Sequence, residues 1–348
     1  MRKRLSALLL LLLLALTGCA SWGGTPAQQG PQRYEASFLD LFDTVTVVIG
    51  YAESEEDFAA LAQEIHDELE VYHRLYDIYN DYEGLVNLKT VNDRAGQPVQ
   101  VDRRIMDLLV LAREMYDATG GQVNVAMGSV LRLWHDAREA ALSDPSGAAI
   151  PAEEEIAGAL EHISFDTVVL DEENSTVCLT DPEQSLDVGA LAKGYAAEQV
   201  ARGLEEDVLI SVGGNVRASG PRADGTPWVV GVQDPDGGDT YLQTLNLSQG
   251  SLVTSGDYQR YFTVDGVRYH HIIDPSTGYP ARRYRAVTIL CEDSGIADGL
   301  STALFLMGQE EGRALLDQYG ADALWILPDG TMDATEGFAQ AVRTTNER

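Results

Sequence analysis

The sequence predicts an α+β fold, in which helices and largely antiparallel sheets form two closely packed subdomains with a ligand cleft between them. Helical periodicity and hairpin signals are mixed along the chain, and they do not alternate as the βαβ units of a parallel sheet would. The chain has 348 residues, enough for one large domain or two intimate ones. Its apolar content of 45% is ordinary and can build a sizeable core.

Residues 1–18 are expected to be a lipoprotein signal peptide. A basic start at residues 2–4 precedes an apolar run over residues 5–16, which is too short for a comfortable membrane span. Small residues and then Cys19 follow this run, in the order of a bacterial lipobox, where the cysteine is lipidated and becomes the new N-terminus. The alternative is an ordinary cleaved signal with an incidental cysteine. The first interpretation predicts a lipid anchor at Cys19 on the extracytoplasmic face of the membrane.

A tether and then a folded domain are expected to follow the signal. Residues 19–33 are rich in Gly, Pro, Ser and Gln, which is typical of a flexible linker. Residues 34–348 form the folded domain, which opens with a β-branched strand over residues 38–51. No segment after the signal is apolar enough to span a bilayer.

The N-terminal half of the folded domain is expected to be mainly helical. Apolar residues at helical spacing predict a helix that begins at Glu55, and Asp102 is the expected N-cap of a second helix that ends at Gly120. The other expected elements are helices over residues 126–141 and 151–161, and a strand pair over residues 166–170 and 176–180.

The C-terminal half is expected to be richer in strands. A helix from Gly189 to Leu204 precedes them, and Asp265-Gly266 is a hairpin signal between two short strands. The remaining expectations are strands over residues 207–212, 216–219, 228–233, 240–247, 251–254, 285–292 and 324–327, helices over residues 295–307 and 309–319, and a C-terminal strand after the turn at residues 328–330.

The composition restricts the possible ligands. Lys and Arg number 24 and Asp and Glu number 55, a net charge of −31 that repels nucleic acid and anionic lipid headgroups. The same charge repels a phosphorylated ligand unless a cation lies between them. Cys178 and Cys291 lie in strand-like surroundings without metal-ligand spacing, so they carry no function, and both a disulfide and two buried thiols remain open.

Two glycine-containing stretches are candidates for ligand binding. In residues 187–195, Asp187 precedes a glycine-rich helix start, whose free N–H groups suit a phosphate, and Lys193 adds a positive charge. An N-cap aspartate followed by small packing residues explains this stretch equally well. In residues 211–216, paired glycines allow a ligand to approach the backbone closely, although a tight turn between strands is the simpler explanation.

Two further stretches carry side chains suited to chemistry. Residues 270–278 contain adjacent histidines and Asp274, and histidine is the natural acid or base near neutral pH. Adjacent strand residues face opposite ways, so at most one histidine acts, and a structural pair is the alternative. Asp298 and Thr302, four residues apart, share a helix face and offer hard oxygen ligands for Mg²⁺, unless they only cap and pack a helix. A magnesium ion would also resolve the charge conflict.

In their order and spacing, four motifs together resemble the ApbE-type family of FAD:protein FMN transferases. They are residues 187–195, 254–262, 271–278 and 297–303, and the likeness extends over residues 38–341. The resemblance implies that residues 34–348 are the catalytic domain and that Mg²⁺ bridges the FAD diphosphate. The implied metal ligands are the Ala190 carbonyl, Asp298 and Thr302. The implied FAD contacts are Phe42, Tyr79, Gln122, Val123, Asn124, Asp187, Lys193, Ile272 and Ser301.

The chain departs from the family pattern in its N-terminal half. Phe42-Asp43-Thr44 stands where Met-Gly-Thr is usual, and Asn124 stands where an Asp is usual. These departures concern the contacts to the flavin ring rather than the metal and phosphate site.

The resemblance implies Mg²⁺-dependent transfer of FMN from FAD to a Ser or Thr hydroxyl of an exported or membrane redox protein, with release of AMP. His271, with Asp274 nearby, is the expected base, and Lys193 is expected to stabilise the developing charge. Alternatives are an FAD pyrophosphatase that yields FMN and AMP, and a flavin-binding lipoprotein without catalysis. A chain that is itself flavinylated at residues 298–303 is a further alternative, but Thr302 would then be lost to the metal.

Overall fold

The structure is a computed structural model that describes residues 30–238 and 240–343. The predicted signal peptide, Cys19 and the tether up to residue 29 lie outside these residues. Across the described ranges, no helix combines the length and the apolar character needed to cross a bilayer.

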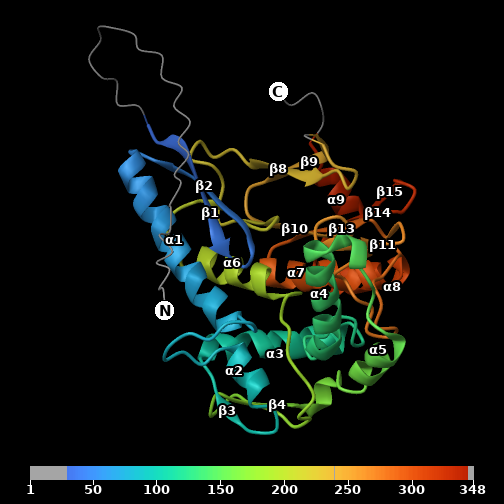
Figure 1. The fold of residues 1–348 in the computed structure, drawn as a ribbon. Coiled ribbons are helices and arrows are strands. Elements are labelled where there is room, and N and C mark those ends of the chain that lie inside the picture. Colours follow the sequence, from blue (N-terminus) through green and yellow to red (C-terminus); the bar gives the residue numbers. More distant parts are fainter. Residues whose placement is uncertain (1–29, 239, 344–348) are drawn as a thin grey trace, which may run out of the picture.

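An antiparallel sheet of eight strands is the centre of the fold (Figure 1). Every neighbouring pair in the order β1-β2-β6-β7-β10-β13-β14-β15 runs antiparallel. The strands are β1 (Gln32–Leu41), β2 (Thr44–Ala52), β6 (Leu209–Val212), β7 (Asn215–Ala218), β10 (Gly250–Gly256), β13 (Ala286–Cys291), β14 (Asp322–Ile326) and β15 (Met332–Ala334).

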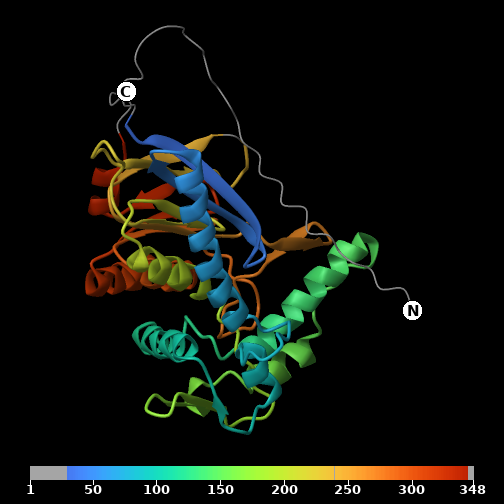
Figure 2. The same ribbon diagram turned by 90° about the vertical axis from the view of Figure 1, so that its left-hand side faces the viewer.

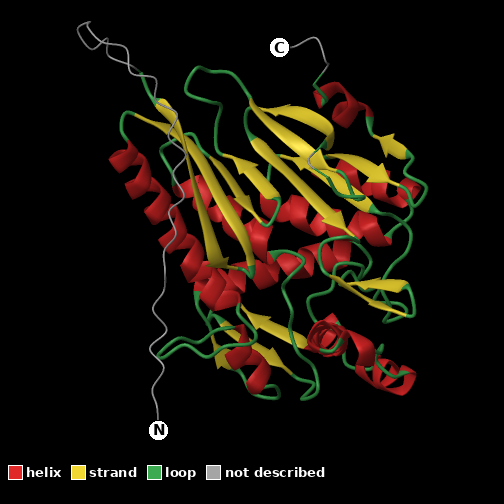
Figure 3. Cartoon of the chain, turned by 45° about the horizontal axis from the view of Figure 1, so that its top comes forward, coloured by secondary structure: helices red, strands yellow, loops and turns green. Residues whose placement is uncertain are grey.

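Both faces of this sheet are covered, because adjacent strand residues point to opposite sides. Val253 belongs to the large core beneath the helices, whereas its neighbour Leu252 belongs to a second core on the other face. One face carries α1 (Glu55–Tyr76), α6 (Ala192–Gly203), α7 (Ser294–Leu306) and α8 (Gln309–Tyr319), and the other carries β8 (Trp228–Gln233), β9 (Tyr241–Leu247) and α9 (Glu336–Ala341) (Figure 3).

A second, smaller group of elements lies at the lower end of α1 (Figures 1 and 2). It contains α2 (Leu88–Asp93), α3 (Arg103–Ala118), α4 (Gly128–Ser143), α5 (Glu153–Leu160), the short 3₁₀ helices η1 (Pro145–Gly147) and η2 (Phe165–Thr167), and a sheet of β3 (Val99–Gln100), β5 (Thr176–Leu179) and β4 (Val168–Asp171). The hairpin of β11 (Tyr261–Val264) and β12 (Val267–His270) packs against α4 through Trp134, Phe262 and Tyr269. The α+β class expected from the sequence is confirmed by this arrangement.

The prediction of one strand over residues 38–51 was wrong, because the chain reverses between β1 and β2. Phe42 and Asp43 both have positive φ, at 53° and 51°, although neither is a glycine. Distant groups hold this turn: the Phe42 amide donates to Nδ1 of His73 at 3.1 Å, and Arg260 donates to the carbonyls of Phe42 and Asp43. Tertiary contacts therefore stabilise a turn that the local sequence does not predict.

Other boundaries differ by smaller amounts. β1 begins at Gln32, so the last residues of the predicted tether belong to a strand. The six-residue α2 was not expected, and α6 begins at Ala192 rather than at Gly189, after a turn. The C-terminal strand is only β15, and α9 follows it. Cys178 and Cys291 are both free, which settles the open question about a disulfide.

Candidate active site

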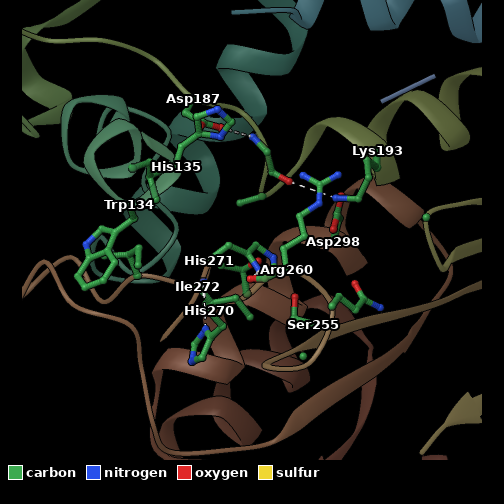
Figure 4. A pocket seen from close by; sticks show the side chains of 18 of the residues that line it. Trp134, His135, Asp187, Lys193, Ser255, Arg260, His270, His271, Ile272 and Asp298 are labelled. Carbon is green, nitrogen blue, oxygen red and sulfur yellow. Dashed lines mark hydrogen bonds between the residues drawn. The ribbon is translucent and has the colours of Figure 1, made fainter. Parts of the chain in front are cut away.

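A cleft of about 230 Å³ lies between the main sheet with α6 and α7 on one side and the α4 region on the other (Figure 4). Both parts of the fold contribute side chains to it, as expected of a ligand site between two subdomains. The cleft is lined by most of the candidate residues from the sequence: Tyr79, Gln122, Asn124, Asp187, Ala190, Lys193, His271, Ile272, Asp298 and Thr302.

Close packing of two helix starts builds one wall of the cleft. A Cβ on Gly194 of α6 would lie 2.6 Å from Cβ of Asp298 in α7, and closer still to the Ser294 carbonyl oxygen, so only glycine fits there. The buried Glu198 strengthens this junction, because it accepts from the Ser294 amide at 2.8 Å and from Arg217 at 2.7 Å. The wall is thus held by backbone contacts and one buried ion pair.

Three oxygen atoms at this junction are left open to the cleft. The Gly194 amide donates to Oδ2 of Asp298 at 2.9 Å and so does not donate to the carbonyl of Ala190, which lies just before α6 and lines the cleft. Among the described residues, no donor meets the other oxygen of Asp298 in hydrogen-bonding geometry, although the Asn215 side chain lies near this carboxylate. Thr302, one turn further along α7, lines the cleft, and its hydroxyl has no hydrogen-bond partner in the described part of the chain. A carbonyl, a carboxylate and a hydroxyl form an all-oxygen set that fits Mg²⁺.

Asp298 is a buried carboxylate without a paired cation. Its side chain is 4% exposed, and burial raises its pKa, an effect that Lys193 and the Gly194 amide only partly oppose. The nearby side-chain amide of Asn215 also lowers this pKa, but Nδ2 of Asn215 does not meet the carboxylate in hydrogen-bonding geometry. A buried carboxylate without a counter-ion is costly, so this site is suited to a bound cation.

Two positive side chains face the cleft beside these oxygens. Nζ of Lys193 donates to the Gly189 carbonyl at 3.3 Å, and Arg260 reaches the cleft from the opposite wall (Figure 4). Asp187 accepts from the Gly189 amide at 2.8 Å, which fixes the turn before α6. Enclosure by the cleft walls raises the pKa of Asp187, while His135, Arg260 and Lys193 act against that shift. The cleft is therefore locally cationic in a strongly acidic chain.

The two adjacent histidines have different surroundings. His270 is buried, and both of its ring nitrogens are engaged, with the Ala281 carbonyl and with the Ile272 amide. His271 is exposed to the cleft, and among the described residues only its Nδ1 has a hydrogen-bond partner, the Arg260 carbonyl at 3.3 Å. Enclosure and the charges of Arg260 and Lys193 lower the pKa of His271, so its Nε2 is a free, neutral acceptor. Since the ring stays open to the cleft, a bound anion would reverse the charge effect.

Aromatic side chains form the end of the cleft opposite α7. Tyr79 stacks on His135, with ring centroids 4.9 Å apart and planes 27° apart. The loop after α1 presents Tyr79, because Asp77 accepts from the Tyr79 amide at 2.6 Å. Trp134 is anchored by a 2.7 Å hydrogen bond to the Gly278 carbonyl and contributes to the same end. These rings offer a flat surface to a planar ligand.

Four candidate residues do not line the cleft. Phe42 packs edge-on against His73, and Val123 is fully buried. Asp274 accepts from the amide and hydroxyl of Ser276 and so forms a turn, which removes it from the expected role beside His271. Ser301 is buried and bonds the Asp298 carbonyl and the Ser255 hydroxyl, and it is Ser255 that faces the cleft. Asn124 does line the cleft, but both ends of its amide bond to backbone.

Several cleft residues had no role assigned from the sequence. Arg260 and Ser255 lie within the motif at residues 254–262, which is the sequence signal that could have indicated them. His135 is one residue from the buried Trp134 on α4, and nothing in its local pattern marks it. Elsewhere in the described ranges, a partly exposed cluster of potential metal ligands, His66, Asp67 and Glu70, is found on α1, where His66 already bonds Asp67 and Asp40.

Known proteins share this fold and sequence. A model of the ApbE family matches residues 42–325. The FAD:protein FMN transferase of Treponema pallidum (strain Nichols) is 36% identical over 282 residues, covering 75% of this chain and 76% of that protein. That of Klebsiella pneumoniae (strain 342) is 33% identical over 276 residues, covering 75% and 83%.

Solved structures agree with these matches. The ApbE protein of Thermotoga maritima MSB8 superposes with a TM-score of 0.79 at 33% identity, covering 90% of this chain and 100% of that one. The flavin transferase ApbE of Vibrio cholerae gives 0.75 at 26% identity, covering 89% and 99%. The resemblance expected from the four motifs is confirmed, and the chain is a member of the ApbE family.

Proposed function

We propose that this protein transfers FMN from FAD to a Ser or Thr hydroxyl of another protein, with Mg²⁺ bound at the α6–α7 junction. The observation that carries the proposal is the set of open oxygens from Ala190, Asp298 and Thr302 in a cleft that also presents Lys193 and Arg260. An acidic chain can hold a diphosphate there because local cations offset its net charge of −31. The names of the relatives support the same reaction.

The residues of the cleft have separate roles in binding FAD and in catalysis. Mg²⁺ held by Ala190, Asp298 and Thr302 would neutralise diphosphate charge and polarise its phosphorus. Lys193 and Arg260 bind and orient the non-bridging oxygens. The aromatic end holds a planar ring system of FAD. Phosphoryl transfer asks mainly for such positioning and charge stabilisation.

The transfer step is a displacement at the FMN phosphorus. The acceptor hydroxyl oxygen forms a bond to this phosphorus, and the bond to the bridging oxygen breaks. AMP leaves with that oxygen. Nε2 of His271, the free nitrogen of a neutral ring, takes the proton of the hydroxyl. The product is a flavin joined to its acceptor through a phosphodiester.

We further propose that Cys19 anchors the protein by lipid to the extracytoplasmic face of the membrane. The basic start, the apolar run and the small residues before Cys19 support this location. The acceptor is then a membrane or exported redox protein. A Cys19→Ala variant should lose its lipid and move from the membrane to the soluble fraction.

Mass spectrometry of an acceptor tests the reaction. The purified mature protein is incubated with FAD, Mg²⁺ and candidate membrane redox proteins, and the acceptor should gain the mass of an FMN group. EDTA should abolish this gain. FMN and AMP without a modified acceptor would indicate a pyrophosphatase, and tight FAD binding without turnover would indicate a binding protein; either outcome contradicts the transfer.

A further inference from the structure

The turn between β6 and β7 forms part of the cleft wall, and the proposed transferase reaction uses none of its residues. Gly213 and Gly214 have φ values of 60° and 92°, which L side chains rarely adopt. A Cβ on Gly213 would lie 2.7 Å from Oγ1 of Thr44, so the turn is pressed against the start of β2. This geometry places Asn215, the first residue of β7, opposite Val212 and at the cleft.

Asn215 is buried but its amide is not satisfied. The residue is only 2% exposed, and its Nδ2 has no hydrogen-bond partner among the residues that the structure describes. Buried side-chain amides almost always have a partner, because an unpaired donor loses its hydrogen bonds to water. The Asn215 side chain faces the same cleft as Asp298 and Thr302. The Asp298 carboxylate is close enough for Asn215 to lower its pKa, but it does not meet Nδ2 in hydrogen-bonding geometry, so a ligand in the cleft can supply the acceptor.

Other unpaired buried atoms do not share this position. Thr46 lies on β2, opposite Val212 of β6, and is fully buried with an unpaired Oγ1, but it does not line the cleft. Arg138 lines the cleft and has an unpaired Nε, yet its Nη1 already bonds Glu139 at 2.7 Å. In the chain as described, only Asn215 is both nearly inaccessible and turned toward the ligand space with its donor unused.

We propose that Asn215 is a binding residue for the diphosphate, with Nδ2 donating to a non-bridging phosphoryl oxygen. The inference rests on the proposed function, since a diphosphate that reaches the metal at Asp298 brings its anionic oxygens to this amide. The two glycines before Asn215 fix the turn that aims it, and the donor is prepared before the ligand arrives. The unliganded protein therefore carries an unsatisfied donor that the ligand completes.

Binding measurements on Asn215→Ala test this role directly. ADP and FAD, each with Mg²⁺, are titrated into the mature protein by calorimetry, and riboflavin serves as a ligand without phosphate. A hydrogen bond to a charged group predicts that Asn215→Ala weakens ADP and FAD binding by about tenfold or more. Riboflavin affinity should not change. Equal ADP and FAD affinities in variant and wild type would overturn the proposal.

Stability without ligand separates binding from folding. Asn215→Ala should keep or raise the melting temperature of the unliganded protein, because it removes an unsatisfied donor, and it should reduce the upward shift caused by Mg²⁺ and FAD. Thr46→Val is the matched control: it removes another buried unpaired group nearby and should leave ADP and FAD affinities unchanged. If Thr46→Val weakened binding as much as Asn215→Ala, the effect would be structural, and the proposal would fail.

Asn215→Asp distinguishes a phosphate donor from a metal ligand, since the oxygen and nitrogen of an amide are assigned from their surroundings. A carboxylate at this position should weaken ADP binding at least as much as alanine does, because it repels the phosphate. Tighter Mg²⁺ binding by Asn215→Asp in the absence of nucleotide would make residue 215 a metal ligand and contradict the proposal. Failure of the wild type to bind Mg²⁺ and ADP would instead contradict the proposed function.

Discussion

The two ends of the cleft are built by different means. At the α6–α7 end, backbone atoms and short side chains set the geometry, and Gly194 lets Asp298 come so close that no other residue fits. At the opposite end, Tyr79 from a loop and His135 from α4 contribute aromatic rings that stack on each other. The first end is defined by contacts that tolerate no added atom, whereas the second is defined by ring surfaces that many residues can supply.

Of the positions at which the sequence differs from the family pattern, Asn124 lines the cleft and Phe42 packs against His73, whereas Thr44 lies against Gly213 in the turn before Asn215. The motifs at residues 187–195 and 297–303 meet at the α6–α7 end. A phosphate and metal site needs oxygens in fixed places, while a planar ring needs only flat neighbours.

Removal of the buried carboxylate should have the largest effect. Asp298→Ala should lower FMN transfer on the order of a thousandfold, since metal charge stabilisation supplies several kcal/mol of the barrier. The variant should remain folded, because it loses a buried carboxylate that has no ion pair. Transfer rates with saturating Mg²⁺, together with circular dichroism, check this. A folded variant with near-normal transfer would contradict a metal site at the α6–α7 end.

A single methyl group on α6 should break the same end without touching its chemistry. Gly194→Ala must push α7 away, so stability should fall by about 1–3 kcal/mol and transfer should fall with it. Gly203→Ala is the control in the same helix, because a Cβ there meets nothing within 4 Å. It should be neutral or slightly stabilising. Denaturant unfolding and transfer rates compare the two, and equal behaviour would show that the close packing is not important.

Truncation at the ring end should have a milder effect. Tyr79→Ala removes one stacked ring and should raise the KM for FAD by about tenfold, the range of one ring–base stacking contact, with little change in kcat. Affinity for ADP with Mg²⁺ should change less, if the flavin ring lies against Tyr79. A larger loss of kcat than of apparent affinity would indicate that Tyr79 acts in the chemical step. That result would contradict the proposed difference between the two ends of the cleft.

The pH dependence should show the smallest effect. The pKa of His271 is lowered in the folded protein, so its ring stays neutral at pH values below the ordinary pKa of 6.5. The folding stability linked to this shift is fully present above pH 6.5 and is lost as the pH falls from 6.5 toward the lowered pKa. The profile of kcat/KM, which reports the free enzyme, should therefore show no acid limb near pH 6.5. The acid limb of kcat should lie at higher pH, because the bound diphosphate favours the protonated ring. A kcat/KM limb near the ordinary value that His271→Asn removes would contradict this assignment.

The long, periodic elements of the fold could be predicted from the sequence. The apolar spacing along α1 and the Asp265-Gly266 hairpin each have a local physical cause, and both are present. The turn at Phe42-Asp43 could not be predicted, since His73 and Arg260 hold it from 31 and more than 200 residues away. The short α2 depends on a capping box between Asn87 and Thr90 that is too brief to stand out.

The site was predictable where spacing determines geometry. Asp298 and Thr302 share a helix face, and this spacing already indicated a convergent oxygen pair. Asp274 shows the limit of such reasoning, because a carboxylate near a histidine in sequence serves equally well in a turn, and here it does. Asn215 lies in the glycine-containing stretch 211–216, but only its burial and its unpaired amide single it out within that stretch. His135 becomes a candidate only when its neighbours are known, since no local pattern separates it from packing residues.

Crystals of the mature protein soaked with FAD and Mn²⁺ test the central claim most directly, because Mn²⁺ takes the same oxygen ligands as Mg²⁺ and scatters anomalously. We predict one anomalous peak within about 2.2 Å of the Ala190 carbonyl oxygen, a carboxylate oxygen of Asp298 and the Thr302 hydroxyl, in contact with the diphosphate. A bound FAD with no peak there, or with metal only at the His66 cluster on α1, would contradict the account.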